Sequence, residues 1–264
     1  MHYQKICLDA MEVVKEGATY IRDRHENRQD LNIEVKGRQN FVTEVDKKAE
    51  QILIAGLSEL LPESGFIAEE GTSSRKGEIY NWVIDPIDGT TNFIHAVFPF
   101  AISVGLIENE EIVAGIIYEF GLDEYFYAWK GGGAWLNGHP IHVSGVKQIE
   151  NALIATGFPY TNFTYLEEFM ESIEYFMKNS HGLRRLGSAA TDIAYVACGR
   201  YDAFYEYGLS PWDIAAGLLL VKEAGGKVSN FKGREDPLFQ EDVICSNSRC
   251  HSEFQETIGK IMLP

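Results

Sequence analysis

Hydrophobic residues recur every three to four positions in two stretches near the start of the chain, which predicts two amphipathic helices. The first would run over residues 3–27. The second would span residues 46–61, with Asp46 as its cap and Pro62 as its stop. The polar stretch between them, residues 28–39, has no strong period, so we expect a loop there.

From residue 65 to residue 143 the period shortens toward two, and β-branched and aromatic residues gather in short runs typical of strands. These runs cover residues 82–84, 101–107, 112–118, 125–129 and 141–143. Turns are expected at Asn109-Glu110 and at Asn137-Gly138, because Asn-Gly accepts positive φ at both central positions of a hairpin. The pattern therefore predicts an antiparallel meander.

Beyond residue 145, short strand-like runs alternate with helical patterns, which is typical of a layered α/β arrangement. The expected strands are 153–156, 183–186 and 203–205, and the expected helices are 165–178, 188–198 and 212–224. No linker rich in Pro, Gly or Ser marks the change of pattern. We therefore expect two packed subdomains, residues 1–145 and 146–264.

Composition narrows the classes of protein that remain. The 264 residues include 39 acidic and 23 basic ones, a formal net charge of −16, and 45% of them are hydrophobic, enough for a sizeable core. An acidic chain is a poor general partner for nucleic acid, because phosphate backbones select clusters of Lys and Arg. No apolar run reaches about 18 residues and no export signal is visible, so we expect no membrane partner and a cytoplasmic location. The four cysteines lack zinc-site spacing and are expected to be reduced.

Acidic residues stand at the ends of three apolar runs. The most informative run closes with Asp85-Pro86-Ile87-Asp88-Gly89-Thr90-Thr91. Two carboxylates around a tight turn can share a hard divalent cation. Gly89 leaves room for a phosphate, and the free N–H groups at the start of a following helix can donate hydrogen bonds to it. Glu69-Glu70 ends a second run, and Asp213 begins an apolar helix. Taken singly, these three features also fit a capped turn, a solvated strand edge and a helix cap.

Four stretches together resemble the inositol monophosphatase family of magnesium-dependent phosphatases. They are Ala68-Glu69-Glu70-Gly71, residues 85–93, residues 131–138, and residues 186–190 continuing through Trp212-Asp213 to residue 226. The resemblance implies a layered α-β-α-β-α sandwich of the sugar-phosphatase type, with mixed sheets and helices between and outside them. It also implies two or three Mg²⁺ ions per active site, with Mn²⁺ as a possible substitute, inhibition by lithium, and a homodimer.

The resemblance further implies roles for single residues. Glu69, Asp85 and the carbonyl of Ile87 would hold one Mg²⁺, and Asp85, Asp88 and Asp213 would hold a second. Gly89 and Thr90 would receive the phosphate, and Glu69 with Thr90 would orient the attacking water, so that Glu69, Thr90 and Asp88 form the catalytic set. Gly187, Ser188 and Ala189 would line the substrate ring together with Asp213, and Glu206 would accept hydrogen bonds from its hydroxyls.

These features predict a Mg²⁺-dependent phosphatase for a small phosphorylated polyol, with inositol monophosphate as the leading substrate. Three related activities stay open: hydrolysis of the 2′-phosphate of NADP(H), of fructose 1,6-bisphosphate, or of a nucleotide 3′-phosphate. From a different class, the chain could be a metal-dependent module that binds a phosphorylated ligand or a protein without catalysis. A complete set of acids argues against such an idle module.

Two further expectations concern the metals. Lys36, Asn40, Thr43 and Asp46 match the region of a third metal only loosely. The cluster Glu69, Glu70, Asp85, Asp88 and Asp213 carries five formal negative charges, which two divalent ions would offset by four. Phosphate binding is therefore expected to be weak until the metals are bound.

Overall fold

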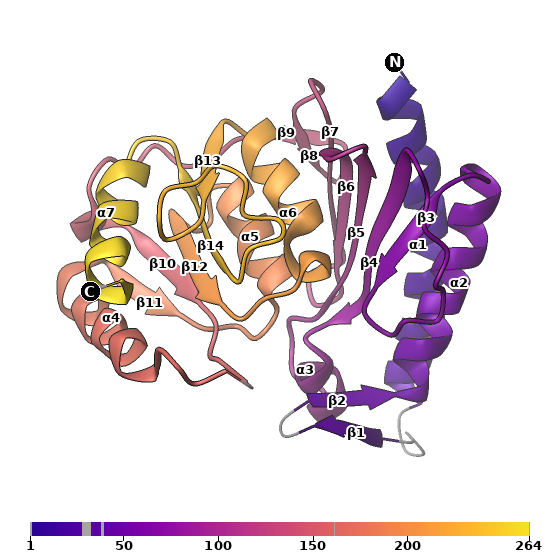
Figure 1. Cartoon of the computed structure of the whole chain (residues 1–264), viewed down its shortest axis with the longest axis horizontal. Helices are drawn as coiled ribbons and strands as arrows, with labels where there is room; N and C mark the ends of the chain where they lie inside the picture. Colours follow the sequence, from indigo (N-terminus) through magenta and orange to yellow (C-terminus); the bar gives the residue numbers. More distant parts are fainter. Residues whose placement is uncertain (1, 28–32, 38–39, 161, 264) are drawn as a thin grey trace.

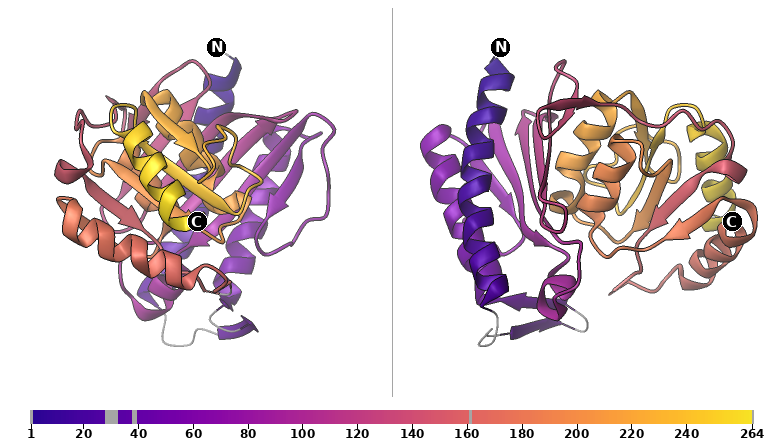
Figure 2. Two further views of the ribbon diagram at one scale, coloured as in Figure 1. Left: turned by 60° about the vertical axis from the view of Figure 1, so that its left-hand side comes forward. Right: turned by 180° about the vertical axis from the view of Figure 1, so that it is seen from behind.

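Helices and sheets alternate in five layers in the computed structural model, which describes residues 2–27, 33–37, 40–160 and 162–263 (Figure 1). One outer layer contains α1 (His2–Glu26) and α2 (Glu44–Leu60), and the other contains α4 (Leu166–Asn179) and α7 (His251–Met262). Between the two sheets lie α5 (Ala189–Ala197) and α6 (Pro211–Glu223), as the right-hand view of Figure 2 also shows. The predicted layered sandwich is thereby confirmed.

The first half of the chain builds a seven-stranded sheet whose strands follow one another in chain order. They are β3 (Gly65–Ala68), β4 (Tyr80–Asp88), β5 (Ala101–Glu108), β6 (Glu111–Glu119), β7 (Glu124–Trp129), β8 (Ala134–Leu136) and β9 (His139–Ile141). Only the pairing of β3 with β4 is parallel, so the predicted antiparallel meander is confirmed from β4 onward. Asn137 and Gly138 adopt φ of 47° and 86°, as the Asn-Gly signal requires. The strand expected at 141–143 lies slightly earlier, and β8 was not predicted separately.

The second half builds a five-stranded mixed sheet in the order β11-β10-β12-β14-β13. Its strands are β10 (Leu153–Thr156), β11 (Gly182–Arg184), β12 (Ala203–Tyr207), β13 (Gly226–Ser229) and β14 (Asp242–Asn247). β10 pairs in parallel with β11 and β12, whereas β12, β14 and β13 pair antiparallel. The sheet thus includes all three strands expected in this half of the chain.

Three hydrophobic clusters fill the spaces between the layers. Val14 and Leu53 of the outer helices pack with Trp82 of the first sheet. The central cluster contains Leu218 of α6 and faces both sheets, and the third contains Phe254 of α7. Residues 214–221 of α6 are all buried because the helix is covered on both sides, which explains its almost wholly apolar sequence.

Two local expectations near the first turn of α2 were wrong. Residues 33–37 of the expected loop form β1 (Ile33–Gly37), which pairs antiparallel with β2 (Asn40–Thr43), a second strand that was not predicted. Strands of five and four residues give too short an alternation to be recognised in the sequence. The rest of the expected loop, 28–32 and 38–39, lies outside the described residues. Thr43, not Asp46, caps α2; Asp46 is the third helical residue and closes a capping box with it.

The described part of the chain contains no helix that is both long and apolar enough to cross a membrane.

Candidate metal and phosphate site

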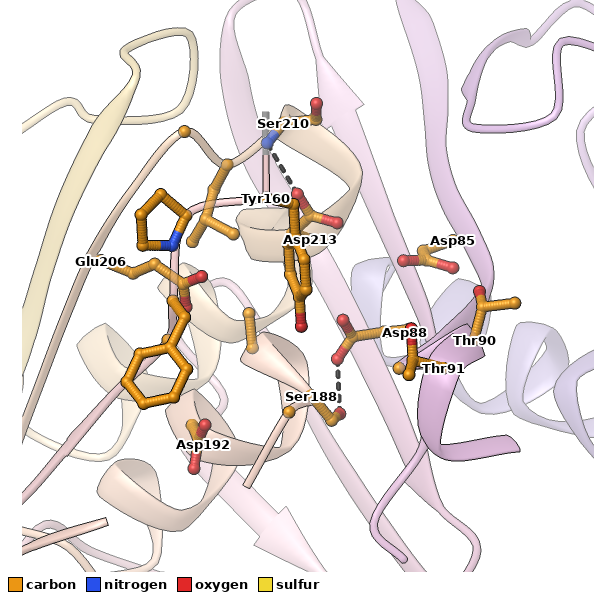
Figure 3. A pocket seen from close by; sticks show the side chains of 18 of the residues that line it. Asp85, Asp88, Thr90, Thr91, Tyr160, Ser188, Asp192, Glu206, Ser210 and Asp213 are labelled. Carbon is orange, nitrogen blue, oxygen red and sulfur yellow. Dashed lines mark hydrogen bonds between the residues drawn. The ribbon is translucent and has the colours of Figure 1, made fainter. Parts of the chain in front are cut away.

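A pocket of about 270 Å³ between the two halves of the chain is lined by Glu69, Asp85, Asp88, Glu206 and Asp213 (Figure 3). Glu70, which the sequence had placed in the same cluster, is not among the described residues that line it. The end of β4, the start of α3 (Thr90–His95), the start of α5, the end of β12 and the start of α6 all border it. The volume lies near the lower end of the usual range for small-molecule sites, about 300–1,000 Å³. The pocket therefore suits a small ligand.

A bulge in β4 turns Asp85 and Asp88 toward the same side. Residues three apart in a regular strand point to opposite faces. Here Asp85 pairs with Ser103 and Asp88 with Ala101, so β4 contains one residue more than β5 over this interval. β4 continues past Pro86 to Asp88, because the bulge accommodates a residue that lacks an N–H.

Asp213 approaches these two carboxylates from the first turn of α6. Its Oδ2 accepts a hydrogen bond of 2.6 Å from the Ser210 backbone N–H and thereby closes a capping box. Asp213 thus takes part in capping α6, the alternative to a metal ligand that the sequence had left open. The Ser103 hydroxyl of β5 donates to the Trp212 carbonyl at 2.9 Å and ties the helix start to the first sheet. One carboxylate oxygen from each of Asp85, Asp88 and Asp213 lies within 4.8 Å of the other two.

All three carboxyl groups have a raised pKa, and burial is the first cause in each. Burial is the main cause of a pKa well above the ordinary value for Asp85 and Asp213, and the charges of neighbouring acids add to it. Burial also raises the pKa of Asp88, to about 6, although hydrogen bonds from Ser188 and Ala190 favour its charged form. A divalent cation would relieve this repulsion, and an all-oxygen donor set suits Mg²⁺. The residues present therefore fit the implied metal.

Glu50 of α2, which sequence reasoning did not single out, organises the segment that follows Glu69. Its buried carboxylate accepts hydrogen bonds from the Glu70 N–H at 2.7 Å, the Thr72 N–H at 2.8 Å and the Thr72 hydroxyl at 2.7 Å. In the sequence, the only sign that Glu50 is buried is its position beside Ala49, on the helix face that contains Leu53. An acid on the buried face of an amphipathic helix requires partners, since burying an unpaired carboxylate is costly.

Replacing Glu50 by Ala is expected to lower the free energy of unfolding by about 2–4 kcal/mol, because hydrogen bonds to a charged group are worth about 1.5–3 kcal/mol each. The Mg²⁺ concentration for half-maximal activity should rise at least about tenfold, since the segment next to Glu69 loses its anchor. Urea unfolding and a Mg²⁺ titration measure the two effects. Glu59→Ala, at an exposed position of the same helix, is the control and should change neither. Equal titrations for both variants would contradict this role of Glu50.

Gly89 and Thr90, the residues expected to receive the phosphate, line the pocket directly after Asp88. Gly89 precedes α3 with φ of 92°, and a Cβ there would lie 2.9 Å from the Gly187 carbonyl oxygen. The Thr90 hydroxyl lies 3.0 Å from the Ile87 carbonyl and 3.2 Å from Oδ1 of Asp46. Asp46 is buried, which raises its pKa. The sequence had linked Asp46 only loosely to a third metal, and its contact with Thr90 was not foreseen.

The predicted residues at the start of α5 and on β12 also line the pocket. Gly187, Ser188 and Ala189 line the pocket at the start of α5, where the Ser188 hydroxyl and the Ala190 N–H both donate to Asp88. Glu206 projects from β12, and burial together with Asp192 raises its pKa well above the ordinary value. Tyr160, Arg185 and Asp192 also line the pocket and were not predicted.

Comparison with known proteins gives a consistent result. Residues 3–262 match the description "Inositol monophosphatase family". An inositol-1-monophosphatase of Mesorhizobium japonicum is 42% identical over 89% of this chain and 88% of its own. A protein of Pseudomonas aeruginosa named Nus factor SuhB is 41% identical over the same shares. The crystal structure of the extragenic suppressor protein SuhB from Bartonella henselae superposes with a TM-score of 0.90 at 36% identity, covering 98% of this chain and 99% of that one.

Proposed function

Because the chain belongs to the inositol monophosphatase family, we propose that it hydrolyses the phosphate monoester of a small polyol, with inositol monophosphate as the leading substrate. The observation that supports this most is the cluster of the buried Asp85 and Asp88 with the half-buried Asp213, beside Gly89. A cluster that only capped helices and turns would not need three mutually repelling carboxylates.

In this proposal Glu69, Asp85, Asp88, Asp213 and the carbonyl of Ile87 hold the Mg²⁺ ions. The bound ions would supply Lewis-acid activation of water and neutralise the charge of the phosphoryl group. Ile87 is suited to its part because the hydrogen bond of its N–H to Asp85 Oδ1, at 2.9 Å, fixes the turn between the two aspartates.

The other residues bind and orient. The Gly89 and Thr90 amides receive the phosphate oxygens, since N–H groups at a helix start attract anions. Thr90, whose hydroxyl is held between Asp46 and the Ile87 carbonyl, orients the attacking water together with Glu69. On the leaving-group side, the start of α5 borders the substrate ring, and Glu206 accepts hydrogen bonds from its hydroxyls. Holding the reactants in place is itself worth several kcal/mol of the barrier.

The remaining expectations form part of the same proposal. They are two or three Mg²⁺ ions per site, inhibition by lithium, a homodimer, a cytoplasmic location, no nucleic-acid partner, and subdomains that meet near residue 145. The non-enzymatic alternative, a metal-dependent binding module, stays relevant because a relative of nearly the same identity is named Nus factor SuhB. The acid set of this chain is complete, which favours catalysis.

The test is phosphate release with and without Mg²⁺ from inositol 1-phosphate, NADP⁺, fructose 1,6-bisphosphate and 3′-phosphoadenosine 5′-phosphate. We expect Mg²⁺-dependent release, fastest from inositol 1-phosphate and reduced by lithium. Faster release from another member of the panel would reassign the substrate. No release from any of them would favour the binding module.

A further inference from the structure

An apolar pocket lies next to the acidic one and shares lining residues with it. Its volume is about 520 Å³, and its wall includes Phe158, Tyr160, Phe163, Leu166 and Met170 from the segment before α4 and from the first turns of that helix. Thr91, Phe158, Tyr160 and Arg185 belong to the walls of both pockets. The two pockets therefore adjoin along these side chains, and we refer to them together as the hollow, with an acidic end and an apolar end.

The apolar end is an unusual part of the surface. Eight of the 13 exposed large hydrophobic side chains found among the described residues lie within residues 158–177. Phe163 is 46% exposed and Met170 is 54% exposed. Scattered exposed apolar side chains are ordinary, but a contiguous apolar hollow usually marks a site for a ligand or a partner.

Arg185 holds the shared wall in place. Its guanidinium lies 5.1 Å from the ring centre of Phe158 and 5.6 Å from that of Tyr160, and it also donates a hydrogen bond to the Tyr160 hydroxyl. Cation–π contacts of this kind orient aromatic side chains. The two rings are thus fixed where the acidic and apolar ends meet.

Thr91 connects the proposed phosphate position to the apolar pocket along the chain. It directly follows Thr90, the proposed phosphate ligand, and it lines the apolar pocket. A group linked to the phosphate through a short spacer can therefore enter the apolar end while the phosphate stays at Gly89 and Thr90. The group that fills the apolar end can therefore be part of the same molecule as the phosphate.

We propose that this hollow is a second leaving-group subsite, which takes the aromatic or other apolar part of a phosphate monoester whose phosphate binds at the acidic end. The subsite rests on the proposed phosphatase function and extends it from polyol phosphates to arylalkyl and similar esters. A planar ring would stack against Phe158 or Tyr160 and contact Met170, whose flexible thioether adapts to aromatic partners.

The test compares ethyl phosphate with 2-phenylethyl phosphate, which share a primary alkyl ester and differ by one ring. The wild-type chain with Mg²⁺ should show a kcat/KM at least about tenfold higher for the phenyl ester, mainly through a lower KM, since burying a ring of this size favours binding strongly. Phe163→Ala and Met170→Ala should reduce this ratio to below about threefold. Met177→Ala, an exposed residue of the same helix that does not line the hollow, should leave the ratio unchanged.

The ratio separates the proposal from misfolding, which would lower both rates together. A wild-type ratio near one, or a ratio that Phe163→Ala and Met170→Ala leave intact, would overturn the subsite. An unchanged ratio with altered sedimentation of these variants would assign the face to a second copy of the chain instead. If no ester is hydrolysed, the proposed function fails separately, and binding of 2-phenylethylphosphonate against ethylphosphonate by calorimetry still decides whether the subsite exists.

Discussion

Replacing Asp88 by Asn is expected to reduce Mg²⁺-dependent phosphate release at least about a thousandfold. Asp88 belongs to the cluster in which one carboxylate oxygen each of Asp85, Asp88 and Asp213 lies within 4.8 Å of the others, and it is buried against the start of α5. Losing one of the three charges weakens the binding of a divalent cation and leaves the phosphate charge less well compensated. A thousandfold corresponds to about 4 kcal/mol of transition-state stabilisation. Phosphate release from inositol 1-phosphate under saturating Mg²⁺ measures the effect.

The variant should nevertheless fold. An Asn Oδ1 can still accept the hydrogen bonds from Ser188 and Ala190, and the substitution removes a charge that raises the pKa of Asp213. Without metal, its melting temperature should equal or exceed that of the wild-type chain. The wild-type chain should gain about 2.7 kcal/mol of stability at a Mg²⁺ concentration one hundred times the Kd, and the variant should gain much less. Wild-type turnover by a folded Asp88→Asn chain would refute the assigned site.

The acids of the site could be predicted because each stands in a short segment whose local pattern is strong. Asp85 and Asp88 flank a proline and a glycine, and Asp213 begins a helix with Ser210 and Pro211 before it. Their proximity could not be derived from spacing. It depends on a bulge in β4 and on the hydrogen bond from Ser103 to the start of α6, both of which are products of tertiary packing.

Residues that act through others were missed. In the sequence, Glu50 does not differ from the other acids of its helix. Only the structure shows that its carboxylate accepts hydrogen bonds from the Glu70 and Thr72 N–H groups. Asp46 was singled out as a helix cap and, loosely, for a third metal, whereas its contact with the Thr90 hydroxyl, 44 residues away in the sequence, was not predicted. Contacts of this separation leave no periodic trace in a single sequence.

The fold was predicted best where periodicity extends over many residues. The meander and the helices of the second half needed only small corrections of their ends. The pairing of β1 with β2 was missed because runs of five and four residues have almost no periodic signal. The apolar sequence of α6 predicts that this helix is buried. It does not predict how closely α6 packs on the first sheet, which depends on two glycines of that sheet.

Those glycines, Gly105 on β5 and Gly115 on β6, lie beneath α6. A Cβ on Gly115 would stand 2.8 Å from the Ala216 carbonyl oxygen and 2.9 Å from its Cα, and a Cβ on Gly105 would stand 3.0 Å from the Ala215 Cβ. The obstacle at Gly115 is helix backbone, which cannot turn away as a side chain can. The absence of side chains at these two positions thus sets how close α6 comes to the sheet.

Gly115→Val should therefore destabilise the chain by more than about 4 kcal/mol, beyond the usual 1–3 kcal/mol for an overpacked core, because the whole of α6 must move. For a chain of this size the melting temperature should fall by at least about 8–16 °C. Gly145→Val, where a Cβ would meet no atom within 4 Å, is the matched control and should shift the temperature by less than about 2 °C. Since α6 carries Asp213, any folded Gly115→Val chain should also need more Mg²⁺ for activity. Calorimetry and a Mg²⁺ titration check both effects, and equal melting temperatures for the two valine variants would show that α6 is not held by this contact.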